Sequence, residues 1–72
     1  MEIRHLKYFI EIARYRSFSH AAEAIHVSQP TLSRTVRELE MELGQEVFRR
    51  TNREVELTSF GESFLPRAQS VV

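Results

Sequence analysis

Residues 17–44, SFSHAAEAIHVSQPTLSRTVRELEMELG, decide the fold. The first part predicts a short, alanine-dense helix from Phe18 to Ile25, for which Ser17 or Ser19 offers an N-cap. The next two residues leave room only for a tight corner, and the first of them is a histidine, which tolerates a left-handed backbone. Small side chains on a short helix let a neighbouring helix approach closely.

The second part of the stretch predicts a longer helix over residues 29–43. Ser28 is a good N-cap, and Pro30 falls in the first turn, where its missing N–H costs nothing. Gly44 then ends the helix. An apolar stripe runs along it at helical spacing and consists of Leu32, Val36, Leu39 and Leu43. The opposite face carries Pro30, Ser33, Arg34 and Arg37.

On either side of this stretch the pattern predicts a helix and a hairpin. Residues 3–15 carry apolar side chains at helical spacing. Residues 54–57 alternate between acidic and apolar side chains, as a half-buried strand does. Residues 47–50 can pair with that strand around a turn at 51–53, where Asn suits a positive φ. The tip of this wing is expected to carry Arg50, Asn52 and Arg53.

A last helix is expected to start at Thr58 or Ser59, and Ser59 with Glu62 fits a capping box. Pro66 is expected to bend this helix or to need help from its neighbours. The apolar stripe of the helix has two interpretations: it packs on its own domain, or it pairs with a second copy. A small domain needs more apolar contact than it owns, which favours dimerisation. The stripe consists of Phe60, Phe64, Leu65, Ala68 and Val71.

Composition narrows the class of protein. The chain has 72 residues, of which 42% are hydrophobic, enough for one small core. It has no cysteine, which excludes disulfides and thiolate zinc sites. No apolar run approaches the roughly 20 residues of a membrane span, and the charged start lacks the order of a signal peptide. We therefore expect a soluble cytoplasmic domain with no membrane contact.

The charges sum to zero but are segregated along the chain. Ten Lys and Arg residues balance ten acidic residues. Residues 28–37 and 47–53 hold only bases, and residues 38–46 between them hold only acids. Because salt screens exposed charges beyond roughly 10 Å, a neutral chain of this kind can present a basic face. Ordinary salt bridging on the surface is the other interpretation.

Catalysis is poorly supported. The three histidines, His5, His20 and His26, share no i, i+4 ligand spacing, and neither Cys nor Asp can complete a metal shell. The two glycines cannot form a phosphate-binding loop. We expect no enzyme, no metal and no cofactor in this chain.

A short helix, a corner and a longer helix with a polar outer face form a helix-turn-helix, whose second helix enters the major groove of DNA. Gln29 can offer a donor and an acceptor to adenine, and Arg34 or Arg37 can reach guanine through two hydrogen bonds. Thr31 and Ser33 can bind a phosphate or a base. The wing arginines can contact the DNA backbone or a minor groove. The full expected DNA interface consists of Ser17, Ser28, Gln29, Pro30, Thr31, Ser33, Arg34, Arg37, Arg50, Asn52 and Arg53.

The alternative is a winged-helix module that binds a protein, such as RNA polymerase, through its acidic residues 38–46. The dependence of the binding affinity on salt distinguishes DNA binding from protein binding. DNA binding weakens steeply with salt, and an apolar docking surface does not.

Residues 6–9 (LKYF), 17–25 (SFSHAAEAI) and 27–33 (VSQPTLS) resemble the N-terminal domain of LysR-type transcriptional regulators. The resemblance continues without a gap through residues 47–50 (VFRR) to Gly61. It implies a winged helix-turn-helix over residues 1–58, with the helix-turn-helix at about 18–37 and the wing at about 47–57. Residues 59–72 then start the linker helix through which such regulators dimerise.

The resemblance also implies roles and partners. Gln29, Pro30, Ser33 and Arg34 match groove-facing positions of the family, Thr31 lies near the DNA backbone, and Arg50 and Arg53 match wing contacts. The implied ligand is a double-stranded operator, an interrupted dyad bound by a homodimer. The effector domain that senses a small-molecule inducer in this family is absent here, so the chain resembles an isolated DNA-binding fragment.

Overall fold

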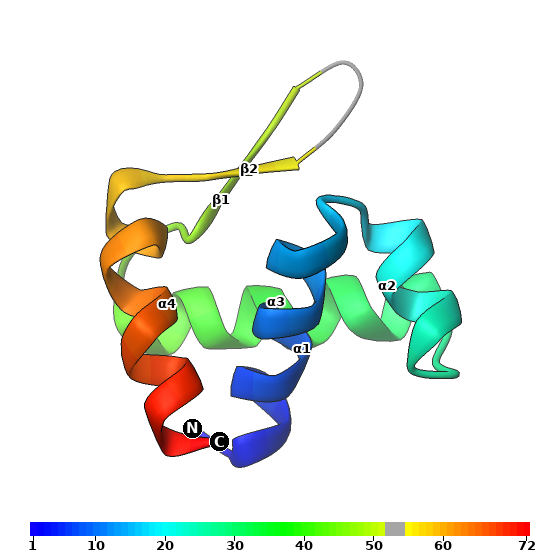
Figure 1. The fold of residues 1–72 in the computed structure, drawn as a ribbon, viewed down its shortest axis with the longest axis horizontal. Coiled ribbons are helices and arrows are strands. Elements are labelled where there is room, and N and C mark those ends of the chain that lie inside the picture. The colour runs from blue at the N-terminus through cyan, green and yellow to red at the C-terminus, as the bar shows by residue number, and fades with distance from the viewer. Residues whose placement is uncertain (52–54) are drawn as a thin grey trace.

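The computed structural model describes residues 1–51 and 55–72. In these ranges the chain forms four helices and one antiparallel pair of strands (Figure 1). This confirms the expected fold class, mainly α with a small two-stranded wing. In chain order the elements are α1 (Ile3–Tyr15), α2 (Phe18–Ala24), α3 (Gln29–Leu43), β1 (Phe48–Arg50), β2 (Val55–Leu57) and α4 (Ser59–Val71).

The ends of α2 and α3 follow from local chemistry, as predicted. The Ser17 hydroxyl accepts a hydrogen bond from the N–H of His20 at 3.1 Å and caps α2. The helix ends at Ala24, one residue before the predicted end. His26 turns the corner with φ of 61°, and Gly44 ends α3 with φ of 69°. Both adopt the left-handed backbone that the sequence led us to expect.

Helix α4 starts at Ser59, within the prediction, but its cap differs from the one expected. Its N-cap is Thr58, whose hydroxyl oxygen accepts from the N–H of Gly61 at 3.0 Å, so the capping box of Ser59 and Glu62 is wrong. The reason lies outside the helix. The Thr58 hydroxyl donates to the carbonyl of Glu46 at 2.6 Å, and its N–H donates to the carbonyl of Val47 at 3.0 Å. These bonds hold Thr58 extended, and Ser59 is already helical.

The core lies between α1 and the elements around it. Helix α1 contacts α2, α3 and α4, and Figure 1 shows it in front of α3 with α2 and α4 on opposite sides. Phe9 of α1 is fully buried, and its ring centroid lies 5.3 Å from that of Phe48 and 5.4 Å from that of Phe64. The other large, fully buried side chains are Ile12, Leu32, Leu39 and Val47.

The hairpin of β1 and β2 projects from the helices (Figure 1), and its base is tied to them. Phe48 pairs with Leu57, and Arg50 pairs with Val55. One carboxylate oxygen of Glu40 accepts from the N–H groups of Val47 at 2.8 Å and Phe48 at 3.4 Å. Helix α3 thereby fixes the point at which β1 begins. The predicted tip residues Asn52 and Arg53 lie outside the described residues.

Candidate nucleic-acid interface

The first turn of α3 is built from its own polar side chains. The Ser28 hydroxyl accepts from the N–H of Thr31 at 3.2 Å and donates to the Thr31 hydroxyl at 2.8 Å. One turn later, the buried Thr35 hydroxyl donates to the carbonyl of Thr31 at 2.9 Å. The Ser28 hydroxyl already donates one hydrogen bond and accepts another within the cap. The donor of Ser28 that remains available to an anion is its main-chain N–H.

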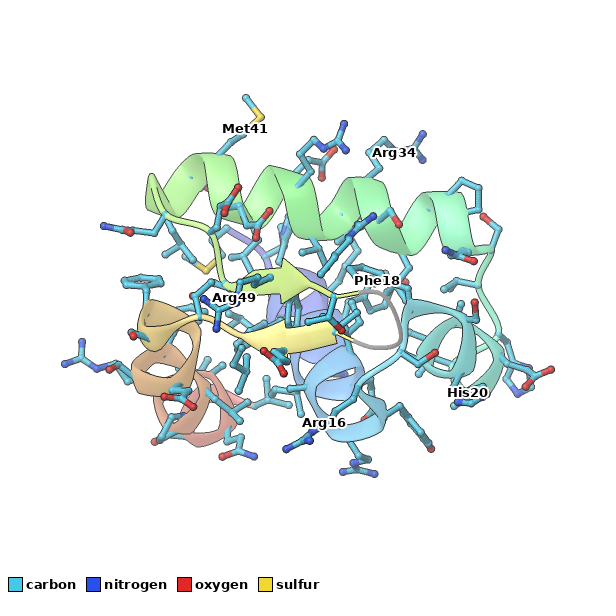
Figure 2. The ribbon with its side chains drawn as sticks, turned by 90° about the horizontal axis from the view of Figure 1, so that it is seen from above. Arg16, Phe18, His20, Arg34, Met41 and Arg49 are labelled. Atoms are coloured by element: carbon cyan, nitrogen blue, oxygen red, sulfur yellow. The ribbon has the colours of Figure 1, made fainter. Side chains whose placement is uncertain are left out.

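Helix α3 divides into a buried and an exposed face, as its spacing predicted. Leu32, Val36 and Leu39 are buried, with 3% of its surface or less exposed in each case. Pro30, Arg34 and Arg37 are exposed. Figure 2 shows Arg34 pointing away from the rest of the molecule on the outer side of α3. Leu43, the last member of the predicted stripe, is half-buried.

A groove between α3 and the wing brings predicted site residues from two elements together. Ser33 and Arg37 line it from α3, and Arg50 lines it from β1. The guanidinium carbon of Arg50 lies 4.5 Å from the centre of the Phe18 ring, a cation–π contact with the start of α2. Arg49 of β1 lies opposite Glu56 of β2, and the two side chains form an ion pair at 3.7 Å.

Most of the acidic residues in the segment 38–46 have partners within the domain, although Glu38 and Glu42 are exposed at its surface. The Glu38 carboxylate lies 3.2 Å from His5 Nε2, and that of Glu42 lies 2.7 Å from the N-terminal ammonium. A hydrogen bond from this ammonium lowers the pKa of the Glu42 carboxyl below its ordinary value. Glu40 holds the base of β1. Three of the four acids that were expected to face a protein partner therefore have partners within the domain.

His5 is a structural residue that the sequence pattern did not single out. It is 5% exposed. Its Nδ1 accepts from the N–H of Glu2 at 3.0 Å, so Nε2 carries the proton that faces Glu38. The His5 N–H in turn donates to the carbonyl of Glu2 at 3.0 Å, so the two residues bond reciprocally at the start of α1. The spacing of residues 2 and 5 was the available signal.

The apolar stripe of α4 packs mainly on its own domain. Ala68 is 1% exposed, and Phe64 packs against Phe9. Phe60 stacks on Phe64 with ring centroids 5.8 Å apart, and Leu65 is half-buried. Ala68 thus offers no surface to a second copy, in contrast to Val71, which is 62% exposed.

Residues 1–51 and 55–72 lack the features of two other kinds of site. No helix there is long and apolar enough to cross a membrane. Those residues also contain no group of three or more His, Cys, Asp or Glu side chains that could hold a metal ion.

A helix-turn-helix with an exposed polar face on its second helix, followed by a two-stranded wing, defines the winged helix-turn-helix class of DNA-binding domains. The family model described as "Bacterial regulatory helix-turn-helix protein, lysR family" matches residues 3–62. The chain belongs to this family and is its helix-turn-helix DNA-binding domain.

Curated relatives are regulators of transcription. The HTH-type transcriptional regulator BudR of Klebsiella aerogenes is 47% identical over all 72 residues, which span 50% of that protein. The Hca operon transcriptional activator HcaR of Escherichia coli (strain K12) is 44% identical over 72 residues, which span 24% of its length. The chain thus spans half or less of these relatives.

Solved structures with the same fold include complexes with DNA. The complex of the BenM DNA-binding domain with catB site 1 DNA superposes with a TM-score of 0.95 at 39% identity, covering 99% of this chain and 80% of that one. The complex of the CbnR DNA-binding domain with DNA gives 0.95 at 42% identity, covering 99% and 82%.

Proposed function

We propose that this domain binds a double-stranded operator in a sequence-dependent way, with the N-terminal half of α3 in the major groove. One observation carries the proposal. The carboxylates of Glu38, Glu40 and Glu42 are engaged within the domain, and Arg34 and Arg37 form no ion pair within the described residues. Unpaired arginines on an exposed helix face supply both phosphate and base contacts.

The proposed roles follow from position. Gln29 reads adenine, and Arg34 or Arg37 reads guanine. The Ser17 hydroxyl and the first turn of α3 contact phosphates, and Arg50 in the wing contacts the DNA backbone or a minor groove. Asn52 and Arg53, predicted to do the same, are part of this proposal. The domain acts by binding rather than by catalysis and needs no cofactor of its own.

The whole protein is part of the proposal. By analogy with its longer relatives, this domain works in the cytoplasm as one part of a regulator that senses a small-molecule inducer. A homodimer formed through α4 places two copies of α3 on two half-sites of an interrupted dyad. The surface around Met41, exposed in the C-terminal part of α3, is the one that we assign to a protein partner such as RNA polymerase.

Selection of bound sequences from a random DNA library tests the core of the proposal, because the selection itself reveals the operator. Arg34→Ala should weaken binding to the selected sequence by about 1–3 kcal/mol and relax the preference at one base position. Arg67→Ala removes the same charge from the exposed side of α4 and serves as the matched control. If the domain enriches no sequence, or if both variants bind like the parent, the proposed surface is wrong.

A further inference from the structure

A side-chain hydrogen bond joins the two helices of the helix-turn-helix. The Ser19 hydroxyl of α2 donates to Oε1 of Gln29, the first residue of α3, at 3.1 Å. Both side chains are exposed. Ser19 therefore contacts a side chain that the proposed function places against a base edge, although Ser19 is not among the residues expected to bind DNA.

This bond restricts the Gln29 side chain, whose exposed amide would otherwise rotate freely. A serine hydroxyl can donate to an amide oxygen or accept from an NH₂ group, so it holds the amide in place whichever end faces it. In the structure Oε1 lies on the side of α2. The Nε2 group of Gln29 has no hydrogen-bond partner within the described residues, so it is free to donate to a ligand.

We propose that Ser19 is a positioning residue that holds the Gln29 side chain at the start of α3, with its amide placed to read adenine. As the side chain lies in the structure, Nε2 can donate to adenine N7, and the second lone pair of Oε1 can accept from adenine N6. Ser19 thus orders a rotatable side chain before DNA arrives, which raises discrimination without a further base contact. The inference rests on the proposed function, since it assumes that Gln29 meets a base.

The hydroxyl of Ser19 can be removed without removing a helix cap. The cap of α2 is Ser17, which accepts from the N–H of His20. Ser19 is exposed, so Ser19→Ala leaves no cavity. We expect this variant to unfold at the same temperature as the parent.

The experiment first uses Gln29→Ala to identify the base position at which preference disappears in the selected operator. Binding is then measured on duplexes that carry each of the four bases there. Ser19→Ala should reduce the discrimination in favour of adenine by about two- to tenfold, the value of one ordered side chain. Ser19→Thr should restore it. Ser70→Ala, an exposed serine of α4, should leave it unchanged.

Two further measurements distinguish positioning of the Gln29 side chain from a general structural effect. In the free protein, Ser19→Ala should shift the NMR signals of the Gln29 side-chain NH₂ group, and Ser70→Ala should not. In the Gln29→Ala background, Ser19→Ala should have no further effect on base preference.

The failures are distinguishable. If the parent domain has no base preference, the proposed function fails and takes this inference with it. If Gln29→Ala leaves every preference intact, the assignment of Gln29 to a base fails, and the role of Ser19 fails with it. If Ser19→Ala keeps the adenine preference and the NH₂ signals of the parent, the positioning role of Ser19 alone is overturned.

Discussion

His26 holds the corner between α2 and α3 in a left-handed backbone, with φ of 61°. A residue with a Cβ atom adopts this conformation at a cost of about 1–2 kcal/mol, and glycine does so freely. We predict that His26→Gly has a free energy of unfolding about 1 kcal/mol higher than that of His26→Ala. Urea denaturation of the two variants measures the difference. Equal midpoints would mean that the corner is not strained.

Gly61 is required by a close approach. A Cβ atom placed on it would lie 2.2 Å from the carbonyl oxygen of Val47 and 3.0 Å from a methyl carbon of Leu57. This carbonyl oxygen belongs to the backbone, so it cannot rotate away as a flexible side chain could. We predict that Gly61→Ala lowers the free energy of unfolding by about 1–3 kcal/mol, although alanine favours helices. Thermal unfolding tests this, with Ser63→Ala, an exposed position of the same helix, as the control.

The residues that the sequence could predict are those whose partners lie within one helical turn. Ser28 and Gly44 were assigned correctly because a cap bonds to residues three or four positions away. Glu40, His5 and Ser19 were missed in their structural roles. These partners lie 7, 33 and 10 residues away, so the local pattern does not indicate these three contacts. Only the second contact of His5, with Glu2 three residues away, had a local signal.

Among the elements, the same contrast between local and distant partners distinguishes α3 from α4. The apolar spacing and the Ser28 and Gly44 signals defined α3 completely. Two possible caps, Thr58 and Ser59, stand side by side at the start of α4. The choice depends on bonds to the carbonyls of Glu46 and Val47, which only the folded chain brings close.

The wing depends on α3 because a lone pair of three-residue strands is unstable in water. Glu40 connects the two by accepting two N–H groups at the start of β1. We predict that Glu40→Ala lowers the free energy of unfolding by about 1–3 kcal/mol, since these donors lose a charged acceptor. Glu46→Ala removes an exposed carboxylate nearby and should change little. A similar loss of unfolding free energy in Glu40→Ala and Glu46→Ala would contradict the proposed role of Glu40 in holding the start of β1.

For the whole molecule, the pairing of charges explains how a neutral chain can bind a polyanion. Arg50 is exposed and rests on the Phe18 ring instead of an acid. We predict that Arg50→Ala weakens binding to all DNA sequences and lowers the salt slope, the change of log K with log salt, by about one. Fluorescence anisotropy at several salt concentrations measures this. An unchanged slope would place Arg50 away from the phosphates.

The fold gives dimerisation less support than the other predictions, because most of the apolar stripe of α4 packs within the domain. We expect a weak dimer that DNA strengthens, and Val71→Glu should weaken it because Val71 is exposed. Sedimentation velocity with and without operator duplex measures both effects, with Gln69→Glu as the charge control. A monomer under both conditions would contradict the proposal.

The division of charge along α3 has a consequence for the approach to DNA. Arg34 lies in the N-terminal half of α3, whose first turn is the positive end of the helix dipole, and Arg37 lies just past the middle. Glu38 and Glu42 lie in the C-terminal half, toward the negative end. A molecule with no net charge whose charges are divided along one axis feels little net pull from a distant polyanion. It feels a torque, which turns the N-terminal end of α3 toward the phosphates during the encounter. Orientation, rather than attraction, is therefore where electrostatics should act on the association rate.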